Sequence, residues 1–133
     1  MNAGVPPAPA FRVGPLTRTD IVRYAGASGD FNPIHHDEAF AVSVGLPGVM
    51  AHGMLSAGIL ASFVTRWFGG NSVYRFKVRF RERVWPGDVL SAEGRVVGLV
   101  EAAGGQRATL ELALLQQDGK PVITGSAEVA LHH

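Results

Sequence analysis

The chain has 133 residues, the usual size of one domain with a single core. Hydrophobic residues make up 47% of it and charged residues 17%, so apolar surface remains that an oligomer would usually cover. The formal charge of +1 gives no reason to expect nucleic acid or a membrane as a partner. The absence of cysteine from the sequence excludes disulfides, thiolate nucleophiles and thiolate-bound metals, and a cytoplasmic location is expected.

The two ends of the sequence differ from the middle. The opening MNAGVPPAPA lacks the basic start and continuous apolar core of a signal peptide, and its Pro and Ala content predicts a flexible lead-in over residues 1–12. A single domain is expected over residues 13–133. No stretch is apolar over the roughly 18 residues that a membrane span needs without a charge or a Gly break. The last two residues, His132 and His133, resemble the remnant of an expression tag and are given no function.

The first half of the sequence predicts two short helices and one long apolar helix. Thr17 and Asp20 have the spacing of a capping box, which places the start of the first helix there. Asp37 is the expected N-cap of the second helix. The stretch from Gly53 to Phe68 has one charge and small or apolar residues almost all round, which predicts a helix buried on most sides.

The second half has the pattern of an antiparallel sheet. The segment VYRFKVRFRERV alternates strictly, so its apolar and basic side chains fall on opposite faces of a strand. The apolar set is Tyr74, Phe76, Val78 and Phe80, and the basic set is Arg75, Lys77, Arg79 and Arg81. Turn signals at Pro86-Gly87-Asp88, Gly104-Gly105 and Asp118-Gly119 separate three further strands. This order predicts an α+β fold in which the sheet wraps around the apolar helix. The basic face is either solvated or in contact with the phosphates of a carrier or coenzyme.

The candidate chemistry lies in SGDFNPIHHD, the segment from Ser28 to Asp37. Asp30 and His35 are separated by a turn that contains Pro33, and such a turn can bring both side chains to one point. An Asp and a His that converge can hold one water between them and move one proton on and one off. Asn32 does not titrate, but its amide can fix the loop or contact a substrate.

A second candidate element is AHGML, where His52 and Gly53 open the apolar helix. The first N–H groups of a helix have no intrahelical partner, and Gly exposes its N–H to a close carbonyl oxygen. In a dry site such a donor stabilises an oxygen that gains negative charge. Together with Asp30 and His35, this donor suits the addition of water to an α,β-unsaturated thioester, or its removal.

Each candidate residue also has a structural interpretation. Asp30 alone suits a turn cap, His35 alone a satisfied structural histidine, and His36 a surface or packing residue. His52 suits a helix cap or a support for the loop better than an acid or base. A metal bound by Asp30, His35 and His52 is disfavoured, because no tight His-x-His or His-x₃-His spacing appears.

The segment from Tyr24 to Leu55, YAGASGDFNPIHHDEAFAVSVGLPGVMAHGML, resembles the hydratase-2 motif of the MaoC-like dehydratases, the family of (R)-specific enoyl-CoA hydratases. The resemblance begins at about Leu16 and continues, more weakly, to the end of the chain. PLTRTDIVRYAGASGDFNPIHHDE is similar to the catalytic subunit of the actinobacterial-type (3R)-hydroxyacyl-carrier-protein dehydratases. The family implies a hot-dog fold, with a curved antiparallel sheet around a central helix over about residues 52–68. It also implies a dimer that joins two sheets, with a thioester tunnel between the subunits.

The same resemblance implies roles for three residues. The Asp of the family motif falls on Asp30, its His on His35, and the Gly whose N–H faces the thioester carbonyl on Gly53. In the family, water adds syn to a trans-2-enoyl thioester and gives the (R)-3-hydroxyacyl thioester. By analogy, His35 takes a proton from water, while Asp30 holds the water and delivers a proton to the α-carbon. Coenzyme A or an acyl carrier protein carries the acyl group, and no metal or redox cofactor takes part.

The sequence departs from part of the family at the middle of the central helix. Some single-domain members have a hydroxyl residue near position 61, where this chain has Ala61 followed by Ser62. The acyl-chain preference is therefore open, although Gly58 and Ala61 leave room for a chain. The choice between homodimer and heterodimer is also open.

Two other functions compete with hydration. One is a hot-dog acyl-CoA thioesterase. The other is an acyl-binding module, or a subunit of a heterodimeric dehydratase that is active only with a partner chain. The presence of both Asp30 and His35 favours a hydro-lyase, since a purely binding subunit needs neither residue.

Overall fold

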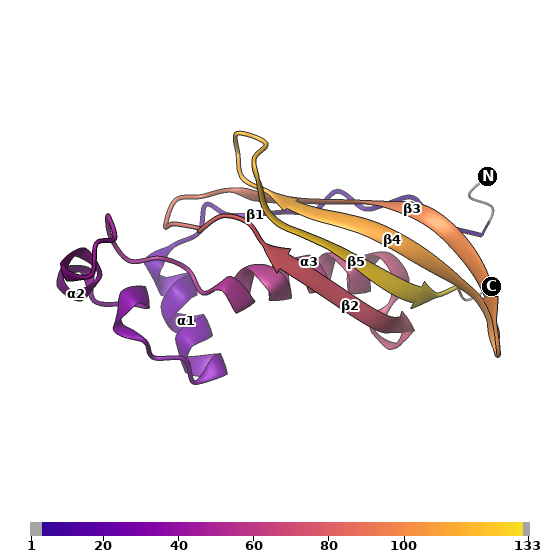
Figure 1. The fold of residues 1–133 in the computed structure, drawn as a ribbon, viewed down its shortest axis with the longest axis horizontal. Helices are drawn as coiled ribbons and strands as arrows, with labels where there is room; N and C mark the ends of the chain where they lie inside the picture. The colour runs from indigo at the N-terminus through magenta and orange to yellow at the C-terminus, as the bar shows by residue number, and fades with distance from the viewer. Residues whose placement is uncertain (1–3, 132–133) are drawn as a thin grey trace.

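The computed structural model describes residues 4–131, so the predicted tag remnant at positions 132–133 lies outside the described residues (Figure 1). The elements in chain order are β1 (Arg12–Val13), α1 (Arg18–Ser28), η1 (Pro33–His35), α2 (Glu38–Ser43), α3 (Gly53–Phe68), η2 (Gly70–Ser72), β2 (Val73–Phe80), β3 (Leu90–Ala102), β4 (Gly105–Leu115) and β5 (Pro121–Ala130). The sheet runs along α3, and α1 and α2 lie beyond one end of it (Figure 1). None of the helices within residues 4–131 is both long and apolar enough to cross a bilayer.

The five strands form one antiparallel sheet in the order β1-β3-β4-β5-β2. Short turns join β3 to β4 and β4 to β5, as the Gly-containing turn signals predict. The strand β2 pairs with β5 on one side only, so it forms an open edge of the sheet. This arrangement confirms the α+β hot-dog prediction, and the central helix starts and ends within one residue of its predicted bounds.

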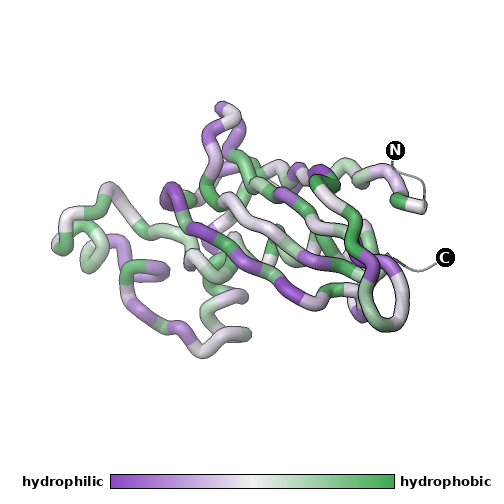
Figure 2. Tube along the Cα trace, turned by 45° about the vertical axis from the view of Figure 1, so that its right-hand side comes forward, coloured by the Kyte–Doolittle hydropathy of each residue, from purple (hydrophilic) through white to green (hydrophobic). Residues whose placement is uncertain are grey.

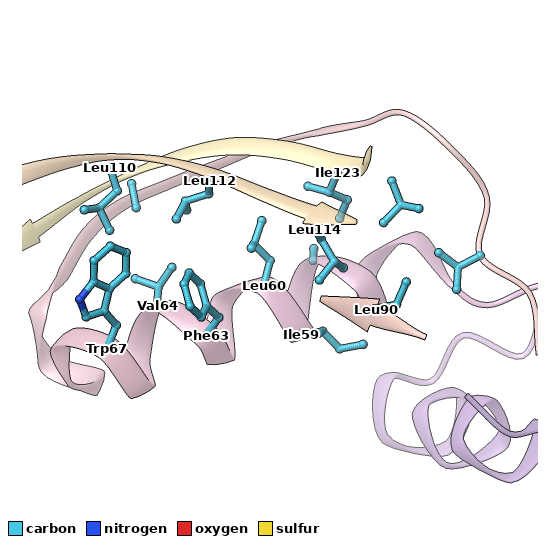
Figure 3. Close-up of a cluster of buried hydrophobic side chains, with 14 of the residues drawn as sticks. Ile59, Leu60, Phe63, Val64, Trp67, Leu90, Leu110, Leu112, Leu114 and Ile123 are labelled. Atoms are coloured by element: carbon cyan, nitrogen blue, oxygen red, sulfur yellow. The ribbon is translucent and has the colours of Figure 1, made fainter. Parts of the chain in front are cut away.

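The core lies between one face of the sheet and one side of α3. Large side chains of α3 point toward the strands (Figure 3). The principal members of this core are Ile59, Leu60, Phe63, Val64, Trp67, Leu110, Leu112, Leu114 and Ile123. The close approach of sheet and helix requires Gly94 on β3, because a Cβ there would lie 2.9 Å from side-chain atoms of both Leu112 and Trp67.

The prediction that α3 is buried on most sides is wrong for this single chain. Residues on its far side, including Met54, Gly58, Ser62 and Thr65, are exposed. The sheet covers one side of the helix, and the described part of the chain supplies no second layer over the other side. The apolar composition of the helix includes both sides, and the exposed residues on the uncovered side are small ones together with Met54 and Arg66.

The predicted alternation holds over most of β2, but Tyr74 is on the wrong face. Alternating hydrophobic and hydrophilic residues are visible along this strand in Figure 2. A register shift between Val73 and Arg75 inserts Tyr74 as an extra residue. Its ring lies against the guanidinium of Arg107, 3.7 Å from the ring centroid, and 59% of Tyr74 is exposed. A bulge turns a side chain to the other face without changing the sequence pattern around it.

Residues 1–3 of the flexible lead-in predicted over residues 1–12 lie outside the described residues, whereas residues 4–12 contact the domain at several points. The Trp67 indole N–H donates to the carbonyl of Pro6 at 2.8 Å. The Phe11 ring lies 5.8 Å from that of Phe63, and the Phe11 carbonyl accepts from the backbone N–H of Ala92. Val5 also packs against the core, so this segment covers apolar surface at the end of α3.

Candidate active site

The loop that carries Asp30 is held by a chain of side-chain to backbone hydrogen bonds. Helix α1 ends at Gly29, whose φ of 75° is the left-handed conformation that glycine adopts without strain. The Asp30 carboxylate accepts from the N–H of Asn32 at 3.2 Å, and the Asn32 amide oxygen accepts from the N–H of Ile34 at 3.1 Å. Asn32 is thus the N-cap of η1, with Pro33 following in the first turn. These contacts give Asn32 a role in fixing the loop.

His35 presents one free ring nitrogen toward Asp30. Its Nδ1 lies 2.7 Å from the carbonyl oxygen of Met50, which can only accept, so Nδ1 carries the hydrogen. In the neutral ring, Nε2 is then a bare acceptor, and it lies 3.9 Å from Oδ2 of Asp30. That distance is too long for a direct hydrogen bond and short enough for one water to contact both atoms. The His35 ring is only 7% exposed, whereas Asp30 is open to solvent.

His52 braces both members of this pair. Its Nε2 donates to the backbone carbonyl of Asp30 at 3.1 Å, and its ring stacks on that of His35 with centroids 3.7 Å apart. The Tyr24 and His52 rings meet edge to face, with their centroids 4.9 Å apart. His52 occupies the N-cap position of α3 but makes no side-chain capping bond, so of the two predicted structural roles it shows the support of the loop. Its Nδ1 is buried and has no hydrogen-bond partner among the described residues.

His36 has a contact that the sequence did not predict. Its Nε2 donates to the carbonyl of Phe31 at 3.1 Å. His52 and His36 therefore hold two consecutive carbonyls of the loop, those of Asp30 and Phe31. The adjacent histidines at positions 35 and 36 point to different partners, so one faces Asp30 and the other turns back on the loop. The sequence signal was the doubled histidine itself, but it carried no information on direction.

Gly53 lies beside His52 at the start of α3 and lines a cavity of about 640 Å³. Met50, His52 and Ser56 line the same cavity. The first N–H groups of α3 are free of intrahelical partners, and the helix dipole adds partial positive charge there. Asp30 and His35 do not line the cavity. His52 connects the two parts, because it lines the cavity and stacks on His35.

Asp30, His35 and His52 also form the group of potential metal ligands in the described residues, with one ligand atom from each within 4.8 Å of the others. A metal bound by imidazole lies in the ring plane, at about 2.0–2.1 Å from nitrogen for zinc. The His35 and His52 planes are stacked and only 19° from parallel, so the two rings do not direct lone pairs at one shared point. The geometry fits a proton-transfer pair better than a metal centre.

The family model for the MaoC like domain matches residues 8–115. The chain belongs to the MaoC-like family. The match covers the loop of Asp30, the start of α3 and most of the sheet, so the cluster lies inside the family's own region. The sequence predicted Asp30, His35, His52 and Gly53 as site residues. The structure brings the first three into one cluster, and Gly53 lies next to His52.

Relatives of this MaoC-like chain include short hydratases and parts of much longer proteins. The (R)-specific enoyl-CoA hydratase of Aeromonas caviae is 33% identical over 84% of both chains, and that of Rhodospirillum rubrum is 36% identical over 86% of this chain and 78% of its own. The chain spans only 5% of a fatty acid synthase beta subunit of Cochliobolus carbonum, with 37% identity over 80% of this chain. The solved (R)-hydratase of A. caviae has a TM-score of 0.80, 29% identity, and coverage of 94% of this chain and 96% of its own.

Proposed function

We propose that this chain catalyses the reversible hydration of trans-2-enoyl thioesters to (R)-3-hydroxyacyl thioesters. The observation that carries the proposal is the bare Nε2 of His35, 3.9 Å from the carboxylate of Asp30, whose loop is held by His36 and His52. Two relatives of similar length are (R)-specific enoyl-CoA hydratases, which supports this reaction and its stereochemistry.

In the proposed reaction, one water lies between His35 and Asp30. Nε2 of His35 takes a proton from the water as the water oxygen bonds to the β-carbon of the enoyl group. This proton passes from His35 to Asp30, and Asp30 delivers it to the α-carbon. Both groups end the reaction in the state in which they began it, and both act from one side of the substrate, which gives syn addition.

Gly53 is proposed to donate its backbone N–H to the thioester carbonyl. Negative charge moves onto that oxygen as water adds to the β-carbon. A fixed donor at a helix start stabilises this charge without reorganising during the reaction. The position of Gly53 in the cavity lining, next to His52, supports this role.

We propose that the reaction needs no metal or redox cofactor. The stacked geometry of His35 and His52 supports this, since the rings do not converge on one ion. We expect activity to survive extended treatment with EDTA followed by gel filtration, and restored activity on adding back one divalent metal would contradict the proposal.

We propose that two chains join along their β2 strands to form a dimer. This strand is one edge of the sheet, the other being the two-residue strand β1, and Phe80 at the end of β2 is 51% exposed. An exposed, half-apolar strand edge is normally covered in a native assembly. The same pairing is available to two copies or to this chain and another hot-dog subunit. Light scattering of the purified chain distinguishes the alternatives, because a homodimer has twice the mass of the chain.

The test of function is the activity of the purified chain on crotonyl-CoA. Loss of the enoyl absorbance without release of thiol identifies hydration, and release of thiol identifies a thioesterase instead. We expect Asp30→Asn and His35→Ala each to lower the hydration rate by about a hundredfold or more, as loss of a general acid or base does. Near-normal activity in either variant would refute the proposed roles.

A further inference from the structure

The cavity at the start of α3 is also lined by basic residues. Arg81, Arg83 and Lys120 line it together with Gly53, and Glu82 is the one carboxylate among its lining residues. All three basic residues are exposed. Arg81 donates to the hydroxyl of Thr124 at 3.3 Å, and none of the three forms an ion pair within residues 4–131. The three cations therefore outnumber the nearby carboxylate and are free to bind an anion.

The basic character continues onto the outer face of the sheet. A groove of about 390 Å³ there is lined by Lys77, Arg79 and Arg81, so Arg81 belongs to both hollows. Hydroxyl donors also line this groove, from Thr109, Thr124 and Ser126. Glu111 lines it too, but its carboxylate is paired with Arg95. The result is a basic path that leads from the cavity over the edge of the sheet.

The lining of the two hollows changes which basic residues are expected to contact a phosphate. That prediction treated Arg75, Lys77, Arg79 and Arg81 as one set. Arg75 lines neither hollow, whereas Arg83 and Lys120, outside the predicted set, line the cavity. The residues at the cavity are therefore the ones in a position to contact a ligand whose reactive end reaches Gly53.

We propose that Arg81, Arg83 and Lys120 bind a phosphate of the carrier arm of the thioester substrate. The inference rests on the proposed function, because it takes the reacting thioester to lie at Gly53. In coenzyme A and in carrier proteins alike, the pantetheine arm leads from the thioester to a phosphate. Arginine presents a fork of N–H donors that matches phosphate oxygens, and lysine adds a point charge.

The experiment compares three substrates that share the crotonyl group. Crotonyl-CoA carries all the phosphates, a crotonyl-carrier protein carries only the phosphodiester of its prosthetic group, and crotonyl-pantetheine carries none. The variant is Arg83→Gln with Lys120→Gln. The matched control is Arg12→Gln with Arg75→Gln, which removes two exposed charges from the same sheet at residues that line neither hollow.

We expect the Arg83→Gln, Lys120→Gln variant to raise KM for crotonyl-CoA about tenfold or more, since charge-assisted bonds to an anion are lost. Its kcat/KM for crotonyl-pantetheine should stay within about twofold of the unmodified chain. An increase of KM with both phosphate-bearing substrates assigns the contact to the phosphate they share. An increase with crotonyl-CoA alone assigns it to the extra phosphates of the coenzyme.

Three results would overturn the proposal: an unchanged KM for crotonyl-CoA, an equal loss with crotonyl-pantetheine, or a loss with the carrier-protein substrate alone. The last result would mean contact with the protein part of the carrier rather than a phosphate. Failure of the proposed function is distinct, because the unmodified chain would then hydrate none of the three substrates.

Discussion

Replacing His52 with Phe removes one hydrogen-bond donor and keeps a ring stacked on His35. The lost bond is the one from His52 Nε2 to the Asp30 carbonyl, which holds the loop in place. A bond of this kind contributes about 1 kcal/mol, and about 1.4 kcal/mol corresponds to a factor of ten. With that restraint removed, we expect kcat for crotonyl-CoA hydration to fall about fivefold to tenfold, because fewer molecules hold the carboxylate opposite Nε2.

The same substitution should have little effect on stability. His52 Nδ1 is buried and has no partner among the described residues, so exchanging the imidazole for an apolar ring removes an unpaired polar atom. We expect the free energy of unfolding in urea to change by less than about 1 kcal/mol. A fall in kcat without a matching fall in the free energy of unfolding distinguishes a positioning residue from a merely structural one.

His36→Phe is the matched control for this prediction. It removes the donor to the neighbouring carbonyl of Phe31, but His36 is exposed, so water can replace the bond. We expect kcat to fall less than about threefold. The reasoning is refuted if His52→Phe keeps kcat within twofold, or if its activity falls only in proportion to the folded fraction.

Three further predictions concern the fold. Thr17→Ala should lower the free energy of unfolding by about 1 kcal/mol, since Thr17 and Asp20 form a capping box at α1. Hydrogen bonding to the Thr17 backbone N–H lowers the pKa of Asp20, so the stability this contact adds is present above the unfolded pKa of about 3.9 and is lost as the pH falls through the folded value. Urea unfolding of the chain and of Asp20→Asn should therefore differ at pH 7, and the difference should shrink as the pH falls below about 3.9; a constant difference would contradict the assignment. Gly94→Ala should destabilise by about 1–3 kcal/mol, because its Cβ would lie 2.9 Å from Leu112 and Trp67, and an unchanged melting temperature would mean that the sheet and helix relax freely.

Local signals in the sequence predicted most of the fold. The capping box at Thr17, the N-cap Asp37 and the turn at Asp118-Gly119 all appear where expected, because each depends on residues a few positions apart. The features that were missed depend on distant partners. Tyr74 turns outward because β2 and β5 pair with a bulge, and the opening segment packs because Phe11 meets Phe63 across the core.

The candidate site also combines features that the sequence indicated with features that depend on distant partners. The residue types at Asp30, His35 and Gly53 indicated the chemistry, since few side chains can transfer protons near neutral pH. The direction of each ring could not be read from the sequence, because it depends on carbonyls brought in from other segments. His35 is oriented by the carbonyl of Met50, and His52 reaches back to that of Asp30. The free nitrogen that makes His35 a base is thus a product of the fold.

A double substitution tests whether Asp30 and His35 work as one unit. If they share one water and pass one proton between them, removing either group disables the same step, and removing the second costs little more. We expect the Asp30→Asn, His35→Ala double variant to hydrate crotonyl-CoA within about threefold of the slower single variant. Independent groups would instead multiply their losses, to about ten-thousandfold or more below the unmodified chain. A multiplied loss would mean that the gap of 3.9 Å between Oδ2 and Nε2 does not hold a shared water during the reaction.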